Sequence, residues 1–282
     1  MQEAHGFFNI DGVQLEYQLI TPAESVAPTL IFLHEGLGCL AMWKDFPRQV
    51  AQLTGCRVLI YSRAGYGGST PCSLPRPLTF MHDEALNILP KILEAAKIQK
   101  AVLVGHSDGA SIALINAGGI ADERIRGLIL IAPHVFVEQL TLTSIRAARS
   151  AYENTDLRER LARYHGDNVD CAFWGWNGVW LDEDFLDWDL EVYLPKIKVP
   201  VLLIQGKDDN YGTIRQLETI RELLPRGAEQ VILENCGHSP FRDRPAETLQ
   251  AIAGFLRNSL KNISCIPKPE VSHQVSKAPG RP

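Results

Sequence analysis

The sequence has no long apolar run: none of its 282 residues lies in a stretch approaching the ~20 apolar residues of a membrane span. Excess positive charge is also absent, because 28 Lys and Arg residues stand against 33 Asp and Glu residues, a formal net charge of −5. A mildly acidic chain is a poor counterion for phosphate, so we expect neither nucleic acid nor a membrane as partner. The N-terminal MQEAHGFFNIDG has no basic segment before an apolar one, and we expect no signal peptide.

Cysteine is scarce and scattered. The six residues form no CxxC pair and no other metal-ligand spacing; they are Cys39, Cys56, Cys72, Cys171, Cys236 and Cys265. A chain of this length buries enough surface to hold its core without a disulfide framework. We therefore expect free thiols in a reducing, cytoplasmic setting.

Short, β-branched apolar runs recur along the chain. Residues 13–19 alternate between apolar and polar side chains, which predicts a half-exposed strand paired with 7–10 through a turn at Asp11–Gly12. Continuous apolar runs follow at 30–33, 58–61, 101–104, 128–131 and 201–204, and a weaker one at 231–233. Strands buried on both faces have this pattern, so we expect a mostly parallel sheet of about eight strands.

Helical patterns alternate with these strands, at 43–53, 83–96, 107–117, 213–224 and 245–260, and Pro90 should kink the second or lie in its first turns. This alternation predicts a doubly wound α/β fold. No strand pattern occurs between Val135 and Pro195, where 144–152 and 157–164 are helical, so we expect a small helical cap after strand six. The predicted divisions are 1–133 and 196–261 for the core, 134–195 for the cap and 262–282 for a flexible, proline-containing tail.

A G-x-S-x-G sequence at 105–109 lies between a buried strand and a helical pattern. The turn from strand to helix is so sharp that small residues, Gly105 and Gly109, are needed beside a strained serine. Such a turn lifts the Ser107 hydroxyl clear of the sheet, at a helix N-terminus that favours developing negative charge. We predict that Ser107 is a nucleophile; the alternative is a tight turn with a capping serine.

A serine nucleophile needs a base, and the base needs an orienting acid. His238 follows Gly237 in the loop after 231–233, and Asp208 and Asp209 follow the strand at 201–204. A lone loop histidine would normally be solvent-exposed, but this one completes the order serine, acid, histidine. We predict a triad of Ser107, His238 and one of the two aspartates.

These motifs make the chain resemble the α/β-hydrolase fold family, in its serine-dependent esterase and lactonase branch, over about residues 10–260. In that family the acid commonly follows the glycine ending its strand by three residues. Counting from Gly206, the resemblance implies Asp209 as the acid, with Asp208 as runner-up.

The resemblance also implies an oxyanion hole of two backbone N–H groups. Asp108 would supply one, and Gly36 in the loop His34-Glu35-Gly36 the other, with the Glu35 N–H as an alternative. Glu35 stands where the family usually has glycine. Its carboxylate is unfavourable near an oxyanion unless it is turned away or paired. It would therefore contact a polar substrate or the cap, or lie at the surface.

The segment 61–69, YSRAGYGGS, superficially resembles a nucleotide-binding loop, but it lacks G-x-G-x-x-G spacing and no helix directly follows it. It also resembles the family's D-x-R-G-x-G-x-S turn, so we expect Arg63 to buttress the loops. His134 follows the strand at 128–131 and would face the site or its polar rim. Inside the predicted cap, a stretch of fifteen residues contains four tryptophans: Trp174, Trp176, Trp180 and Trp188. We expect them to pack the cap, with Trp174 and Trp176 as candidates to line the pocket.

The residues favour a serine hydrolase that cleaves a small carboxylic ester or lactone through an acyl-enzyme, with no metal or organic cofactor. Dehalogenases and epoxide hydrolases of the fold use Asp as nucleophile, and dienelactone hydrolases use Cys. Ring-cleavage hydrolases commonly have Trp after the catalytic histidine, where this chain has Ser239. Proline iminopeptidases typically show H-G-G-P-G where this chain has H-E-G-L-G.

Two alternatives stay open. Hydrolysis of a carbon–carbon bond in a diketone-type substrate would use the same triad. A ligand receptor of the same fold, with slow or no turnover, would follow if Glu35 damaged the oxyanion hole. In each case we expect a small-molecule partner, and a monomer or homodimer.

Overall fold

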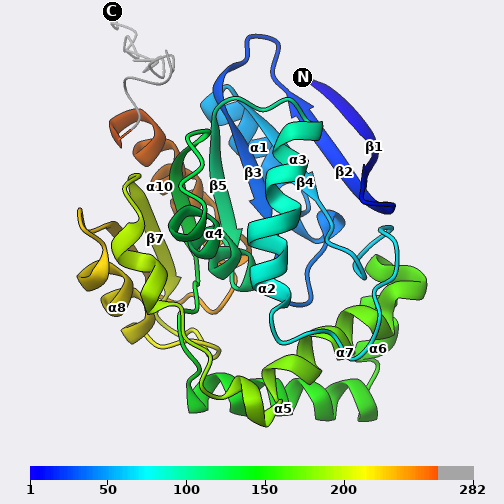
Figure 1. Cartoon of the computed structure of the whole chain (residues 1–282). Coiled ribbons are helices and arrows are strands. Elements are labelled where there is room, and N and C mark those ends of the chain that lie inside the picture. Colours follow the sequence, from blue (N-terminus) through cyan, green and yellow to red (C-terminus); the bar gives the residue numbers. More distant parts are fainter. Residues whose placement is uncertain (260–282) are drawn as a thin grey trace, which may run out of the picture.

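The computed structural model describes residues 1–259, without the side chains of Val26, Ala27 and Ser259 (Figure 1). The predicted tail at 262–282 lies outside the described residues. Within 1–259 the strands form one sheet in the order β1-β2-β4-β3-β5-β6-β7-β8. Their bounds are β1 (Gln2–Ile10), β2 (Val13–Thr21), β3 (Val26–Leu33), β4 (Cys56–Tyr61), β5 (Ala101–His106), β6 (Ile125–Ile131), β7 (Val201–Gly206) and β8 (Glu229–Leu233).

The sheet confirms the predicted α/β fold. β1 and β2 form an antiparallel hairpin across Asp11–Gly12, β2 runs antiparallel to β4, and the other neighbouring strands are parallel. The hairpin strands are longer than the alternating pattern predicts. β1 begins at Gln2, where exposed side chains carry little hydrophobic signal, and β2 continues through the buried Ile20 to Thr21.

The α-helices flank this sheet. Their bounds are α1 (Phe46–Thr54), α2 (Phe80–Asp83), α3 (Leu89–Ala95), α4 (Asp108–Gly119), α5 (Gln139–Asn154), α6 (Leu157–His165), α7 (Val169–Trp180), α8 (Arg215–Leu223), α9 (Pro240–Asp243) and α10 (Pro245–Ser259). Shorter turns are η1 (Leu40–Trp43), η2 (Glu84–Ile88), η3 (Gly166–Asn168), η4 (Glu183–Phe185) and η5 (Glu191–Lys196). No helix of the described part is long and apolar enough to cross a membrane.

Two helix predictions need correction. The helix expected from Trp43 starts at Phe46, because Lys44 has φ +55° and interrupts the helical backbone after η1. The helix expected at 83–96 is the last part of a continuous helical run from Phe80 to Ala95. Its π-helical segment η2 precedes Pro90, whose missing N–H cannot complete the α-helical pattern.

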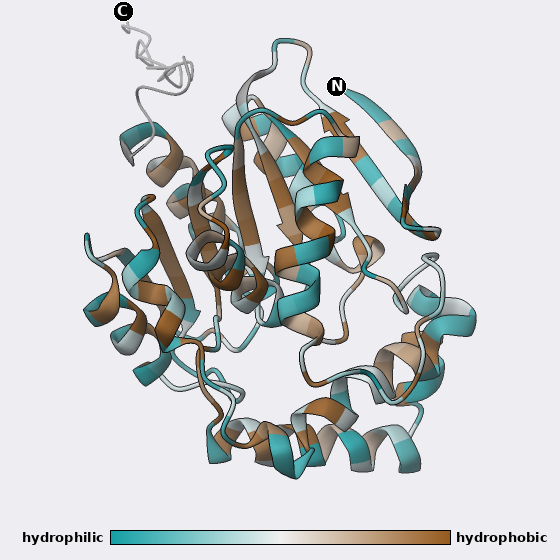
Figure 2. Ribbon diagram, in the orientation of Figure 1, coloured by the Kyte–Doolittle hydropathy of each residue, from teal (hydrophilic) through white to brown (hydrophobic). Residues whose placement is uncertain are grey.

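Alternate side chains of the central strands build two apolar layers. Ile31 and Leu103 pack on the face covered by α2, α3, α4 and α8, whereas Phe32 and Val104 pack on the face covered by α1 and α10. The central strands are accordingly hydrophobic along their length in Figure 2. This explains why their sequences are continuously apolar and easy to recognise.

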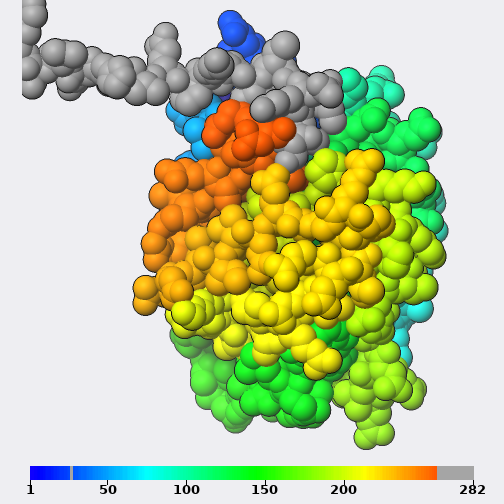
Figure 3. All heavy atoms as spheres, turned by 90° about the vertical axis from the view of Figure 1, so that its left-hand side faces the viewer, coloured from blue at the N-terminus to red at the C-terminus, as the bar shows by residue number. Residues whose placement is uncertain are grey.

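Helices α5, α6 and α7 lie between β6 and β7 in the chain and below the carboxyl ends of the parallel strands in Figure 1. The chain after β7 covers the side face in Figure 3, with green residues of the helical segment along its lower edge. Loops at the carboxyl ends of β3, β5, β7 and β8 therefore meet beside α7, where a ligand site of an open α/β sheet is expected. The division at 134 and 195 stays a prediction.

Candidate active site

Ser107 occupies the turn between β5 and α4 in a strained conformation, with φ +53° and ψ −120°. The backbone holds it there: its N–H donates to the Ile131 carbonyl at 2.9 Å, and its carbonyl accepts the N–H groups of Ala110 at 2.8 Å and Ser111 at 3.1 Å. Its hydroxyl has no hydrogen-bond partner among the described residues. The turn thus presents an unengaged hydroxyl at the start of a helix.

The two glycines of this turn are required by close backbone approach. A Cβ on Gly105 would lie 2.3 Å from the Gly109 carbonyl oxygen, and one on Gly109 would lie 2.0 Å from the Leu33 carbonyl oxygen. The steric reason given for the G-x-S-x-G pattern therefore holds in the structure. Gly109 also brings the serine turn directly against the end of β3.

His238 is oriented by Asp209. Its Nδ1 lies 2.9 Å from both carboxylate oxygens of Asp209, whose Oδ1 also accepts the Tyr211 N–H at 2.8 Å. Asp208 is exposed, and its backbone N–H donates to the Cys236 carbonyl. The structure therefore brings Asp209 to the histidine, as the resemblance implied, and leaves Asp208 outside.

The charges of the pair reinforce one another. Burial disfavours the charged form of His238, but the hydrogen bond and charge of Asp209, with smaller contributions from Glu35 and Asp108, raise its pKa above the usual value. Burial likewise disfavours the Asp209 carboxylate, yet the hydrogen bond to His238 leads the effects that lower its pKa. Asp209 is thus ionised at neutral pH and selects the His238 tautomer with hydrogen on Nδ1.

His106 is a second histidine that sequence reasoning missed. Its buried Nε2 lies 2.7 Å from the His238 carbonyl oxygen, and burial lowers its pKa to about 4. The neutral ring therefore donates through Nε2 and fixes the backbone of the His238 loop. The only signal in the sequence is its place beside Ser107, at the variable position of the motif.

Arg63 holds the loop after β3, as predicted. Its Nη1 donates to the His34 carbonyl at 2.5 Å and its Nη2 to the Glu35 carbonyl at 2.9 Å. The Glu35 carbonyl also accepts the Gly38 N–H at 3.1 Å. In a trans peptide the N–H points opposite to the carbonyl, so these bonds turn the Gly36 N–H away from Arg63.

Gly36 and Asp108 both line the pocket that contains Ser107. The Gly36 N–H has no partner among the described residues, and Asp108 begins α4, where a backbone N–H has no intrahelical acceptor. Two N–H donors are thus available at the positions predicted for an oxyanion hole. The Asp108 side chain is separately engaged, since Trp180 Nε1 donates to its Oδ1 at 3.1 Å and burial raises its pKa to about 6.

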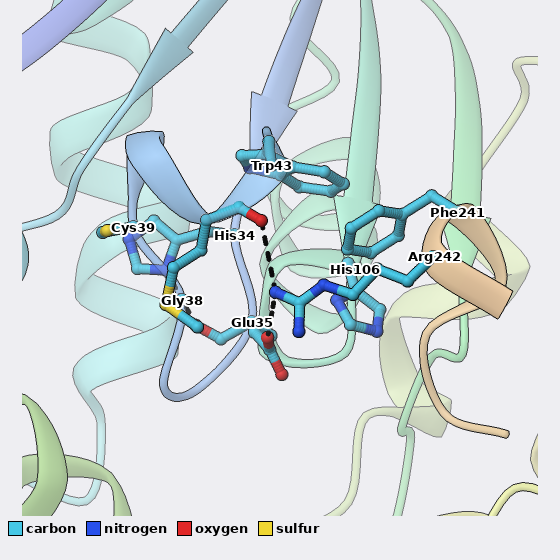
Figure 4. Close-up of a pocket in the computed structure, with 9 residues that line it drawn as sticks. His34, Glu35, Gly38, Cys39, Trp43, His106, Phe241 and Arg242 are labelled. Carbon is cyan, nitrogen blue, oxygen red and sulfur yellow. Dashed lines mark hydrogen bonds and ion pairs between the residues drawn. The ribbon is translucent and has the colours of Figure 1, made fainter. Parts of the chain in front are cut away.

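Glu35 lies at the active-site pocket and is not a free surface residue. Its Oε1 is 3.8 Å from Arg242 Nη2, and its side chain is 20% exposed. Figure 4 shows the carboxylate directed toward Arg242, with His106 alongside. Burial would raise the pKa of Glu35, but His106, Arg242 and His238 lower it below its usual value, so the side chain is ionised at neutral pH.

The pocket has a volume of about 130 Å³ and contains Ser107 and His238. Of the two positions left open for His134, the structure has the one facing the pocket; its ring centre lies 5.7 Å from that of His238, and burial lowers its pKa to about 3. Trp176 and Trp180 supply aromatic surface from α7. This volume is below the usual ~300 Å³ minimum of drug-sized ligand pockets, which favours a small substrate.

The prediction that Trp174 lines the pocket is wrong. Its ring packs edge-on against Tyr152 and Phe173, with the Arg149 guanidinium over it. Trp180 takes the pocket position instead, because it lies one helical turn from Trp176 on α7. Trp176 also touches the loop after β3, since a Cβ on Gly36 would lie 2.1 Å from the indole.

Among the described residues, Glu35, His106 and His238 place ligand atoms within 4.8 Å of one another. Both histidines already use one ring nitrogen within the fold, Nε2 of His106 and Nδ1 of His238. A metal ion in this cluster would compete with the protonation of His238. The donor set thus fits a proton-transfer site, and we assign no metal centre to it.

A model of the alpha/beta hydrolase family matches residues 30–251. The chain is 23% identical to a proline iminopeptidase of Lactobacillus acidophilus over 296 residues, covering 91% of this chain and 99% of that one. It is 27% identical to a putative carbamate hydrolase RutD of Stutzerimonas stutzeri over 249 residues, covering 80% and 90%.

Among solved structures, the enol-lactonase from Burkholderia xenovorans LB400 superposes with a TM-score of 0.69 at 21% identity, covering 89% of this chain and 99% of that one. At this identity the likeness shows the fold alone. The family match spans more than half of the chain and includes the strand ends that carry Ser107, Asp209 and His238. The chain therefore belongs to the alpha/beta hydrolase family.

Proposed function

We propose that this protein is a serine hydrolase of small carboxylic esters or lactones. The observation that carries the proposal is the shared pocket. Ser107 and His238 both line it, and Asp209 accepts a hydrogen bond from Nδ1 of His238. This arrangement supports Ser107 as nucleophile, His238 as base and Asp209 as orienting acid, the set that acyl transfer requires.

In the first half-reaction the Ser107 oxygen attacks the substrate carbonyl carbon while His238 Nε2 takes the hydroxyl proton. Asp209 keeps hydrogen on Nδ1 and stabilises the imidazolium. The Gly36 and Asp108 N–H groups receive the developing alkoxide. The tetrahedral intermediate then collapses, and His238 gives its proton to the departing alkoxide, which leaves Ser107 acylated.

In the second half-reaction water attacks the acyl carbon and His238 takes its proton. The acid product then leaves, and the proton returns to the Ser107 oxygen. We include the segment 134–195 in this proposal as a cap, because Trp176 and Trp180 of α7 line the pocket. Their apolar surface suits a short acyl or lactone carbon chain.

The names of the similar proteins support hydrolysis in general but do not single out one type of bond, since they include proline iminopeptidase, carbamate hydrolase and enol-lactonase. We favour esters and lactones because the cavity is small and the loop H-E-G-L-G differs from the H-G-G-P-G typical of proline iminopeptidases. The proposed partner is accordingly a small molecule.

A turnover assay on p-nitrophenyl esters of increasing acyl length tests the proposal. We expect multiple turnovers with short acyl groups and a rate that falls as the chain outgrows the cavity. Ser107→Ala should lose at least about 10³-fold in kcat. A single stoichiometric burst would favour the receptor alternative, and activity on diketones alone would favour carbon–carbon hydrolysis; either result would contradict the proposal.

A further inference from the structure

The Glu35 carboxylate lies at the pocket without a hydrogen-bond donor among the described residues. Arg242, its ion-pair partner, is 3.8 Å away, beyond hydrogen-bond distance. The guanidinium Nη2 donates instead to the Met42 carbonyl at 3.2 Å, and the Arg242 side chain is 41% exposed. Solvent weakens an ion pair of this kind, so the carboxylate keeps most of its capacity to accept.

Few cationic side chains line the pocket beside Glu35. Arg242 is the only Lys or Arg among the described residues that line the pocket, and Asp108 is a second carboxyl there. Arg63 lies behind the loop, where its guanidinium is occupied by two backbone carbonyls. Burial keeps His134 neutral, so Arg242 is the one permanently charged cation among the described lining residues, against the carboxyl groups of Glu35 and Asp108.

We propose that Glu35 binds an ammonium group of the substrate, carried within a few bonds of the scissile carbonyl. This inference rests on the proposed function and names its substrate class. Glu35 directly precedes Gly36, the proposed oxyanion donor, and offers an oxygen within 4.8 Å of ring nitrogens of His106 and His238. A group bound by Glu35 therefore lies beside the reacting atoms.

An ammonium group also resolves an electrostatic conflict. With a neutral substrate, the Glu35 charge opposes the negative charge that develops on the carbonyl oxygen. An ammonium group neutralises the carboxylate and contributes charge-assisted hydrogen bonds. The substrate then supplies a positive charge that the loop lacks, so the preference appears in kcat/KM and not only in binding.

Two pairs of isosteric substrates test this with the full chain. The acyl pair is the alanyl and isobutyryl p-nitrophenyl esters, in which ammonium replaces methyl. The leaving-group pair is 2-(dimethylamino)ethyl and 3-methylbutyl thioacetate, in which NH⁺ replaces CH. Rates are expressed per protonated amine, and each pair is measured in wild type, Glu35→Gln and the control Glu24→Gln, which removes an exposed carboxylate of the β2–β3 loop.

An ammonium group also activates the ester by induction, so each kcat/KM is divided by the rate constant of spontaneous hydrolysis of that substrate. In wild type we expect one pair, so corrected, to favour its cationic member by roughly 10- to 100-fold, the usual effect of a charge-assisted hydrogen bond. Which pair responds identifies whether the ammonium belongs to the acyl or the leaving group. Glu35→Gln should remove the preference by slowing the cationic substrate and speeding the neutral one, and Glu24→Gln should retain it. A merely structural role would slow both substrates together.

Two results overturn the inference while leaving the proposed function intact: Ser107-dependent turnover with no cationic preference in either pair, or a preference that persists in Glu35→Gln. Absence of Ser107-dependent turnover of all four substrates contradicts the proposed function itself. Should Glu35→Gln fail to fold, the wild-type substrate preference is combined with inhibition constants. Isopropylammonium should then inhibit wild type competitively and more strongly than the neutral isopropanol, and equal inhibition would contradict the inference.

Discussion

At the scale of single residues, the site depends on side chains whose protonation is fixed by their neighbours. Asp209 accepts from His238 and from the Tyr211 N–H, whereas the adjacent Asp208 is exposed. Two chemically identical neighbours therefore have different expected roles. The difference arises from the direction of the chain after β7, which turns one carboxylate inward.

Asp209→Asn should lower kcat/KM by about 10³- to 10⁴-fold, because an amide stabilises neither the required His238 tautomer nor its imidazolium. Asp208→Asn should change it less than about twofold. Steady-state kinetics of both variants on a short p-nitrophenyl ester provide the measurement. The reverse order of effects would transfer the acid role to Asp208.

The pH dependence of activity follows from the raised pKa of His238. General-base catalysis needs the neutral imidazole, so kcat/KM should fall as the pH drops through a value above the usual 6.5. His106, with a pKa of about 4, and His134, with a pKa of about 3, stay neutral over this range and do not contribute. A profile that is flat between about pH 5 and 8 would contradict His238 as the base.

The raised pKa of His238 also makes the stability of the fold depend on pH, in the direction opposite to activity. Because folding raises the pKa of His238, the stabilisation it contributes is fully present below the unfolded pKa and is lost as the pH rises through the folded pKa. Activity and this contribution to stability therefore change in opposite directions across neutral pH. The protein is therefore predicted to be most active at a pH where His238 is neutral and contributes less to the free energy of unfolding.

At the scale of elements, the packing of α4 against β3 sets the distance between nucleophile and oxyanion loop. Gly109→Ala should destabilise the protein by about 1–3 kcal/mol, because the new methyl group would lie 2.0 Å from the Leu33 carbonyl oxygen and force the elements apart. The activity should fall as well. Urea unfolding monitored by tryptophan fluorescence gives the free energy of unfolding.

Gly254→Ala in α10 is the matched control, since a Cβ there has no heavy atom within 4 Å. Removing a helical glycine at an open position should stabilise the protein by up to about 1 kcal/mol. Equal stability changes in the two variants would show that the close approach at Gly109 has no energetic consequence.

Helix α7 also shows where the sequence was insufficient. The tryptophan-rich stretch has no polar–apolar periodicity, because α7 is buried on most of its circumference, and no helix was predicted there. Without the helix, the side of each tryptophan could not be assigned. Trp180 follows Trp176 by four positions, so the two share a face of the helix. Trp174 precedes Trp176 by two positions and therefore points away from the pocket.

At the scale of the whole molecule, the sheet was predictable because its central strands are buried on both faces and therefore continuously apolar. Ser107 and His238 were predictable because their chemistry demands neighbouring glycines or a fixed chain order. For Glu35 the sequence left several contacts open, and for His106 it indicated no role, because these contacts depend on which distant loops meet: His106 bonds to a carbonyl 132 residues away in the chain. Long-range contacts of this kind leave no local pattern.

The contact between Trp176 and Gly36 connects the helical segment to the loop after β3 at a crowded point of the site. A larger side chain at position 36 would have to displace the indole from the pocket wall. The two positions are therefore expected to change together during evolution, although 140 residues separate them. Gly36 and Trp176 should therefore covary among related sequences, because the size of the side chain at one position limits the size allowed at the other.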